Sequence, residues 1–282
     1  GEVHEDDAAT RLAEAVAGPG LVVRGPVDSR IDLLAGHAGL ARVRSSLVTR
    51  LDRIDGLAVF TVFDGQLVDA GTIIASVKTG PHLVAEATIA LAEAIAARGG
   101  PVVEVRPYLR RRVAAIVKGS PAARNRFDAS VRAKIEGLGS TLVSIAYTDD
   151  DVGAVTEAFL RVIRGRERAD LVLTAGGGMT DPSDSFFGAL AVLGGRVISH
   201  GLPGHPGSMA WLGRCGRTVV VGLPSCSAYS NATAVDLLLP WLLAGEPADR
   251  RTVARLGYGG LLTRDMRFRF PAYARTLDAP EG

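Results

Sequence analysis

The chain has 282 residues, which corresponds to about two domains at roughly 150 residues per domain. Hydrophobic residues make up 47 % and charged residues 22 % of the sequence, a composition that excludes an intrinsically disordered chain. The formal net charge is only +2, from 32 basic and 30 acidic residues, and this balance argues against a nucleic-acid partner.

Compartment and membrane association can be judged from the cysteines and the apolar runs. Cys215 and Cys226 form neither a metal-binding pair nor a disulfide framework, and we expect two small buried residues in a reducing cytoplasm. The longest apolar run, residues 232–244, is interrupted by Asp236 and Pro240 and is too short to span a bilayer. The sequence thus predicts a cytoplasmic protein with no membrane partner.

The first hundred residues predict a smaller N-terminal α/β region. Apolar residues at helical spacing and β-branched runs distinguish the two kinds of element here. Helices are predicted over 5–17 and 81–97, and strands over 21–24, 57–63 and 72–78. Residues 25–55 mix helix, strand and turn in an order that the pattern does not fix.

From Arg112 onward, strands alternate with helices. Strands are predicted over 113–117, 141–147, 170–174, 196–199, 209–212 and 218–222, and helices over 124–136, 149–163, 183–193 and 228–244. This alternation is typical of an α/β domain with a largely parallel sheet and helices on both faces. A charged stretch at 106–112 marks a boundary, so we expect domains at 1–110 and 111–248 and a C-terminal tail at 249–282.

Ligands on such sheets bind beyond the carboxyl ends of the strands, which directs attention to the loops there. Residues 174–184 form a glycine-rich turn between a buried strand and a helix, where free N–H groups and a helix dipole favour an anion. The same turn could instead be a simple helix start capped by Asp181 or Ser183.

Three further loops carry residues suited to an anionic ligand. Residues 201–208 place His205 in a rigid loop, residues 222–228 place Ser225 and Ser227 at a helix start, and residues 119–128 carry Asp128. Each of these could equally be a solvated or helix-capping residue. Because Asp128 and Asp184 would repel a phosphate unless a cation lay between them, we expect these two carboxylates to hold Mg²⁺.

Residues 170–184 resemble the D-[ILV]-[ILV]-[ILV]-T-[ST]-G-G-x-S-x-G-x-x-D motif of molybdopterin-binding domains, as in the MoeA-like molybdopterin molybdenumtransferase family. Three other segments occur in the family's order: 126–128 for its Y-D-[ST]-N, 202–213 for its K-P-G-K-P, and 221–227 for its G-L-P-G-N-P-x-S. The resemblance covers residues 112–245 and is that of a divergent branch, some of whose members carry a nucleotidyltransferase-like module.

The resemblance implies binding of molybdopterin or its adenylylated form in molybdenum cofactor biosynthesis, with Mg²⁺-dependent molybdenum insertion. It makes Asp128 and Asp184 the catalytic and metal-binding residues. It also implies a homodimer, and a fused or partner nucleotidyltransferase module. The cofactor-binding residues that we expect are Thr174, Gly176, Gly177, Gly178, Thr180, Ser183, Pro203, His205, Pro206, Ser208, Pro224, Ser225 and Ser227.

The sequence also departs from the family pattern. Leu202 and His205 replace the two lysines of the K-P-G-K-P loop, which removes two fixed cations that would attract molybdate. Two alternative functions therefore stay open. One is a non-catalytic pterin- or nucleotide-sensing or scaffolding domain, and the other is a Mg²⁺-dependent nucleotide pyrophosphatase on the same fold.

Overall fold

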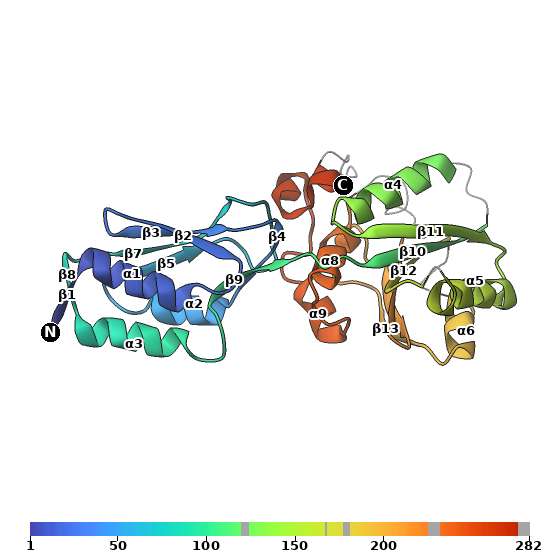
Figure 1. Ribbon diagram of the computed structural model, residues 1–282. Coiled ribbons are helices and arrows are strands. Elements are labelled where there is room, and N and C mark those ends of the chain that lie inside the picture. The colour runs from blue at the N-terminus through green and yellow to red at the C-terminus, as the bar shows by residue number, and fades with distance from the viewer. Residues whose placement is uncertain (120–123, 167, 177–180, 225–231, 276–282) are drawn as a thin grey trace. The chain divides into compact units, whose positions relative to one another are not determined.

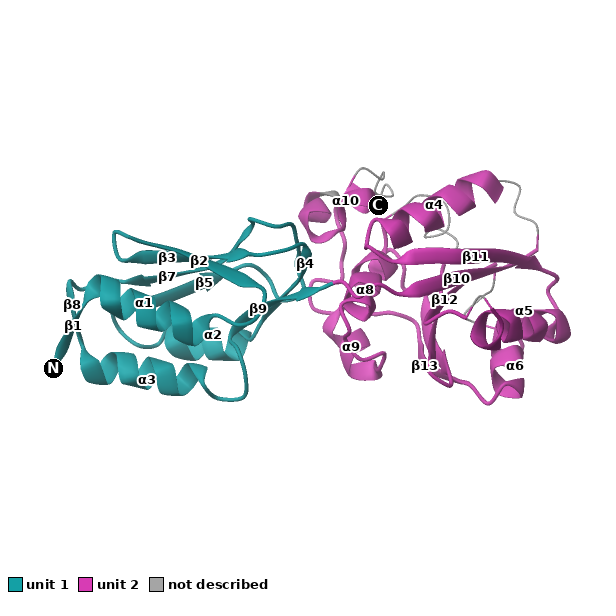
Figure 2. Cartoon of the chain, viewed as in Figure 1, with its two compact units in different colours: residues 1–107 teal, residues 108–282 magenta. Residues whose placement is uncertain are grey.

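A computed structural model describes residues 1–119, 124–166, 168–176, 181–224 and 232–275 of the chain. The chain divides into two compact units, residues 1–107 and residues 108–282 (Figure 2). In the described residues no helix is both long and apolar enough to cross a membrane.

The first unit combines three helices with antiparallel sheets. Its elements are β1 (Glu2–His4), α1 (Glu5–Val16), β2 (Leu21–Val27), β3 (Arg30–Ala35), β4 (Gly39–Val43), α2 (Ser45–Leu51), β5 (Leu57–Thr61), β6 (Leu67–Val68), β7 (Ile73–Thr79), β8 (Leu83–Ala85), α3 (Glu86–Ala96) and β9 (Val103–Pro107). The strands form sheets in the orders β2-β3-β7-β5, β6-β4-β9 and β1-β8. Apolar residues of α1 and α3, such as Leu12 and Ile89, are buried in one core with strand residues such as Leu33.

One predicted helix of this unit starts later than the sequence pattern indicates. The helix predicted over 81–97 begins only at Glu86, because residues 83–85 form β8 and pair antiparallel with β1. The backbone of Leu83 is therefore paired with His4, a partner that is distant in sequence and absent from any local pattern.

The second unit is built on one six-stranded sheet. Its elements are β10 (Arg112–Lys118), α4 (Arg124–Glu136), β11 (Thr141–Thr148), α5 (Val152–Arg164), β12 (Leu171–Ala175), α6 (Ser185–Val192), β13 (Arg196–His200), β14 (Trp211–Cys215), β15 (Thr218–Gly222), α8 (Ala234–Leu243), α9 (Arg250–Arg255), the 3-10 helix η1 (Arg264–Arg269) and α10 (Ala272–Arg275) (Figure 1). The strand order is β11-β10-β12-β15-β14-β13. Strands β11, β10, β12 and β15 are mutually parallel, while β14 and β13 run antiparallel.

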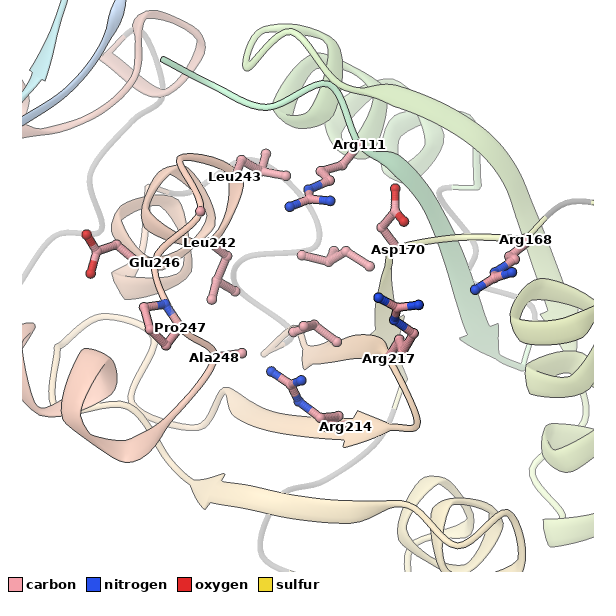
Figure 3. A pocket seen from close by; sticks show the side chains of 13 residues that line it. Arg111, Arg168, Asp170, Arg214, Arg217, Leu242, Leu243, Glu246, Pro247 and Ala248 are labelled. Atoms are coloured by element: carbon pink, nitrogen blue, oxygen red, sulfur yellow. The ribbon is translucent and has the colours of Figure 1, made fainter. Parts of the chain in front are cut away.

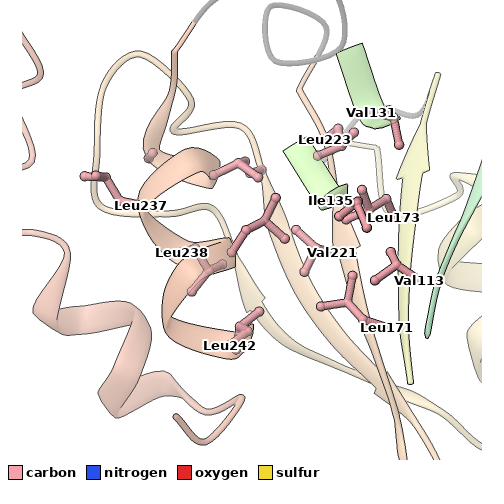
Figure 4. Packing of buried hydrophobic residues seen from close by; sticks show 14 of the residues in the cluster. Val113, Val131, Ile135, Leu171, Leu173, Val221, Leu223, Leu237, Leu238 and Leu242 are labelled. Atoms are coloured by element: carbon pink, nitrogen blue, oxygen red, sulfur yellow. The ribbon is translucent and has the colours of Figure 1, made fainter. Parts of the chain in front are cut away.

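Alternating side chains of the parallel strands fill two separate cores. Leu171 and Leu173 of β12 pack with apolar residues of α4 and α8 on one face of the sheet (Figure 4). Val172, between them in sequence, packs with residues of α5 and α6, including Phe159 and Phe186, on the other face. This period-two burial of continuous apolar strands is what a parallel sheet covered by helices requires. The predicted α/β fold class is confirmed.

One strand at the antiparallel edge of the sheet starts and ends later than the sequence pattern predicts. The strand predicted over 209–212 is observed at Trp211–Cys215, where it pairs with β15. Gly222 lies opposite Trp211 in this pairing, and a Cβ atom at Gly222 would approach the Trp211 indole nitrogen to 1.8 Å. Tertiary packing against the Trp211 ring therefore requires glycine at this position.

Candidate functional site

The loops that the sequence predicts as functional lie at one edge of the second unit's sheet. The register pairs Val117 of β10 with Tyr147 and Ala175, and pairs Gly222 with both Thr174 and Trp211. The chain therefore leaves β10, β11, β12 and β15, and enters β14, at the same edge. We call this the carboxyl edge, and it is where α/β sheets bind their ligands.

The start of the glycine-rich turn is packed tightly against the end of β10. Gly176 has φ +90°, and a Cβ atom there would lie 2.6 Å from the carbonyl oxygen of Lys118. Both facts exclude a side chain, since other residues rarely adopt this conformation and the oxygen belongs to backbone. Glycine at 176 thus fixes where the turn leaves β12.

Thr174, the residue two positions earlier, carries an unusual buried hydroxyl. Its side-chain oxygen is inaccessible to solvent and has no hydrogen-bond partner among the described residues. The backbone carbonyl of Thr174 is satisfied, because it accepts from the N–H of Leu223 at 2.7 Å. A buried hydroxyl without a partner costs about 1–3 kcal/mol, so such a group calls for an explanation.

Lys118 is a buried cation at the carboxyl edge that forms ion pairs with two carboxylates. Its buried ammonium group lies 2.9 Å from Asp184 Oδ2 and 2.8 Å from Asp150 Oδ1, and 4.9 Å from the centre of the Phe186 ring. Ser185 Oγ also donates to Asp150 Oδ1, at 2.6 Å. The hydrogen bond from Lys118 lowers the pKa of Asp150, and the bond from Ser185 lowers it further.

Asp184 has a clear role within this cluster. Its Oδ1 accepts from the backbone N–H of Phe186 at 2.9 Å and caps α6, while its Oδ2 is bound to Lys118. A carboxylate at this position satisfies a free N–H group of the helix and complements the helix dipole. Lys118 and Asp184 together therefore fix the start of α6 relative to the end of β10.

Asp128 belongs to a second cluster, at the start of α4. Tyr147 donates its hydroxyl to Asp128 Oδ1 at 2.5 Å, and the guanidinium of Arg124 lies 3.7 Å from the centre of the Tyr147 ring. Burial and the Asp128 carboxylate raise the pKa of Tyr147, so the phenol stays protonated and acts as a donor. This cluster supplies one carboxylate and one exposed cation to the carboxyl edge.

Among the described residues, the cation beside Asp184 is the ammonium group of Lys118 rather than the predicted Mg²⁺. Both side-chain oxygens of Asp184 are engaged, and the Lys118 ammonium lies between Asp184 and Asp150, whereas the expected Mg²⁺ would be held by Asp184 and Asp128. No group of three metal-binding side chains occurs in the described part of the chain. The donor set around Asp184 thus does not fit a metal ion, and we derive no chemical step through one.

The loop at 201–208 is held mainly by its backbone. The N–H of His205 donates to Gly260 and its carbonyl accepts from Leu262, while the carbonyl of Pro206 accepts from the first N–H of α8 at 2.9 Å. Pro203 packs beside the glycines at 257 and 260, and the carbonyl of Ser208 accepts from Leu202. The His205 side chain itself is exposed. This loop connects the start of α8 to the C-terminal segment.

The remaining predicted ligand-binding residues are only partly described. Ser183 donates to Asp181 Oδ1 through both its N–H and its hydroxyl, and these bonds lower the pKa of Asp181. Pro224 is buried directly after β15. Gly177, Gly178, Thr180, Ser225 and Ser227 lie outside the described residues.

Sequence reasoning did not find Lys118, Asp150 or Tyr147. One signal for Lys118 was available, because the chain has only three lysines among its 32 basic residues. Two of them, Lys118 and Lys134, are buried and paired with carboxylates. In a chain that uses arginine almost everywhere, a lysine at the end of a buried strand indicates a position that needs a compact cation.

Comparison with known proteins agrees with this description. Residues 112–244 match the family described as "Probable molybdopterin binding domain". Among solved structures, the chain is similar to the molybdopterin biosynthesis MoeA protein of Pyrococcus horikoshii, with 15 % identity, 91 % of this chain and 81 % of that chain covered, and a TM-score of 0.32. It is also similar to the molybdopterin biosynthesis enzyme MoaB of Thermus thermophilus, with 20 % identity, 49 % and 99 % covered, and a TM-score of 0.34. No curated protein matches the chain.

The second unit is therefore an α/β domain whose loops gather at the carboxyl edge of a mainly parallel sheet. More specifically, its residues 112–244 match the family of probable molybdopterin binding domains, the same class of domain that the motifs resemble.

Proposed function

We propose that the carboxyl edge of the second unit binds a molybdopterin-type pterin and that the protein acts in cytoplasmic molybdenum cofactor biosynthesis. The family match over residues 112–244 supports the ligand class. The observation that carries the proposal is the buried Thr174 hydroxyl, which has no partner among the described residues and lies where the glycine-rich turn begins.

The Thr174 hydroxyl is an argument for a ligand because no group among the described residues offsets the cost of burying it. A valine would fill nearly the same space without leaving a polar atom unpaired. A hydrogen bond to a polar group of the bound pterin, such as its phosphate, would offset this cost. The hydroxyl is then retained for binding at the expense of stability.

The roles of the two predicted carboxylates follow from their contacts. Asp184 is a positioning residue, since it caps α6 and holds Lys118. Asp128 lies beside the exposed Arg124 and keeps its second oxygen clear of the Tyr147 bond. We therefore assign Asp128 the contact with the ligand and any proton transfer there.

The test of binding is calorimetric titration with molybdopterin, comparing two variants that each remove an unpartnered buried hydroxyl. Thr174→Val should weaken binding by about tenfold, as expected for a lost hydrogen bond of roughly 1.4 kcal/mol, and should leave stability unchanged or raised. Ser144→Ala removes the comparable hydroxyl on β11 and should leave binding unchanged. Equal affinities for all three proteins, or no binding by the wild type, would contradict the proposal.

Molybdenum insertion and Mg²⁺ dependence are the finer parts of the prediction, and Asp128→Asn tests them. In a transferase, this variant should lose molybdate-dependent turnover of the adenylylated pterin while it keeps most of its affinity. A protein that only binds and hands over the pterin has no such turnover in the wild type. Mg²⁺-dependent hydrolysis of ADP-ribose without pterin binding would instead select the pyrophosphatase. Asp184→Ala is a poorer test, because it also uncaps α6.

A further inference from the structure

A pocket of the same unit lies at the opposite edge of the sheet, where β10, β12 and β15 begin. We call this the amino edge. A pocket of about 510 Å³ opens there between the strand starts, the β14–β15 hairpin and the chain after α8 (Figure 3). The seven residues of β10 separate it from the carboxyl edge by about 20 Å. Its charged lining residues are Arg111, Arg168, Arg214, Arg217, Asp170 and Glu246.

The four arginines of this pocket outnumber the two carboxylates that line it. None of the four arginine side chains makes an ion pair there, although other arginines of the chain do. The two carboxylates of the lining are occupied elsewhere. Asp170 accepts the backbone N–H of Arg112 at 3.0 Å, and the buried Glu246 pairs with Arg255 at 3.1 Å. Four like charges around one hollow repel each other unless an anion lies between them.

Two of the four arginines, Arg111 and Arg214, are placed by the strands of the sheet. Arg111 immediately precedes β10, and Arg214 lies within β14, paired with Val219 of β15 and Arg196 of β13. Figure 3 shows Arg111 and Arg214 entering from opposite sides of the pocket. Guanidinium groups held on a rigid frame suit the planar, two-point recognition of phosphate oxygens.

A smaller hollow of about 180 Å³ adjoins the first. It shares Arg168 and Arg217 with the larger pocket and adds Arg164. Five arginines therefore line two hollows that share two residues, which is more positive charge than a single monoanion would balance. A chain of two or three phosphate groups has the length and charge to contact several of them.

We propose that this arginine pocket binds the polyphosphate group of a small molecule. The larger hollow is of the size typical of small-ligand sites, and its exposed lining is mostly polar, as a phosphate chain requires. The site lies at the edge opposite the proposed pterin site and uses none of its residues. It goes beyond the proposed function and can hold if that function fails.

The experiment is calorimetric titration of the full chain with inorganic triphosphate and with ATP, in the presence of a chelator. The wild type should bind one equivalent, with affinity that falls as salt is raised, because phosphate–arginine contacts at a surface pocket are screened. Arg111→Gln and Arg214→Gln should each weaken binding by about tenfold, and the double variant by more. Tighter binding of ATP than of triphosphate would identify a nucleotide as the source, and equal binding a free polyphosphate.

Two controls separate this site from general charge and from the pterin site. Arg132→Gln removes the same charge from α4, where Arg132 forms an exposed pair with Glu136, and should leave binding within about twofold. Thr174→Val, which should weaken pterin binding, should not affect triphosphate. Absence of saturable binding by the wild type, or equal weakening by Arg132→Gln, would overturn the proposal.

Discussion

Two buried lysines of the second unit pair with carboxylates in contrasting ways. Lys134 of α4 binds Asp236 of α8, both side chains are almost fully buried, and the hydroxyl of Tyr273 donates to the same Asp236 oxygen at 3.2 Å. Lys118 is equally buried, yet Asp150, one of its two carboxylate partners, is 62 % exposed. Asp236 also completes the capping box of α8 with Thr233.

The difference separates a structural ion pair from one at a functional edge. Tyr273 packs over Lys134 at 5.3 Å from ring centre to ammonium, and burial together with Asp236 raises the pKa of this phenol. The first pair thus joins α4, α8 and α10 in a sealed interior. The second lies at the carboxyl edge and is exposed on the Asp150 side, so the Asp150 carboxylate can turn to solvent while Asp184 stays bound to Lys118 and to α6.

The largest effect on stability is expected when the lysine of the buried Lys134–Asp236 pair is replaced. Lys134→Met leaves Asp236 charged, buried and without its cation, and should lower the free energy of unfolding by about 3–5 kcal/mol in chemical denaturation. Arg132→Gln on the same helix breaks only an exposed pair and should cost about 0.5 kcal/mol or less. Similar losses in the two variants would mean that burial does not distinguish these ion pairs.

Lys118→Met should cost less, about 1–3 kcal/mol, because the exposed Asp150 can turn to water and the buried Asp184 keeps the hydrogen bond that it accepts from the Phe186 N–H. It should also weaken pterin binding, since Asp184 and the start of α6 lose their anchor. Lys78→Met replaces the exposed lysine of the first unit and provides the control for both measurements. Unchanged pterin affinity in Lys118→Met would show that this cluster is purely structural.

The close approach of the turn to Lys118 can be tested with two glycines of similar conformation. Gly176 and Gly119 have φ of +90° and +73°, but only a Cβ at Gly176 would meet the backbone, whereas one at Gly119 would meet open space. Gly119→Ala should cost about 1 kcal/mol for conformation alone, and Gly176→Ala about 1–3 kcal/mol in total. Denaturant titration of both variants measures the difference, which should vanish if the contact yields freely.

The smallest effect concerns the pH dependence of stability, and it tests the partly exposed pair of Lys118 and Asp150. The pKa of Asp150 is lowered from its ordinary value of 3.8, so its pairing with Lys118 stabilises the folded state above about pH 4. That contribution is lost as the pH falls through the lowered pKa. The stability difference between wild type and Asp150→Asn should therefore shrink toward zero below pH 4. A difference independent of pH would assign the effect to the Ser185 hydrogen bond.

The bounds of the predicted elements show which parts of the fold local sequence patterns determine. The helix at 124–136 and the strand at 218–222 were predicted with the observed bounds, because their apolar spacing and flanking glycines are local signals. β8 was missed, since its strand conformation depends on pairing with β1. The late start of β14 depends in the same way on the contact between Trp211 and Gly222.

The residues of the candidate site also divide into those that local motifs identify and those that only the tertiary structure brings together. Asp128, Thr174, Gly176 and Asp184 could be named from motifs, and the parallel register brings their strands and loops to one edge. The cation between the carboxylates could not be named, because Lys118 and Asp150 are 32 positions apart and meet only when β10 and β11 pair. The four arginines of the amino edge likewise come from three separate segments and carry no motif.

The sequence alone determined the α/β class, the order of the strands and helices between residues 112 and 244, and the molybdopterin-binding resemblance, because hydrophobic periodicity and glycine-rich turns are encoded in neighbouring residues. Tertiary structure alone decided which charges meet: Lys118 with Asp184, Lys134 with Asp236, and the arginines of the amino edge with no carboxylate partner among the described residues. The physical reason is that ion pairing and desolvation depend on distance and burial in space, which separation along the chain does not fix.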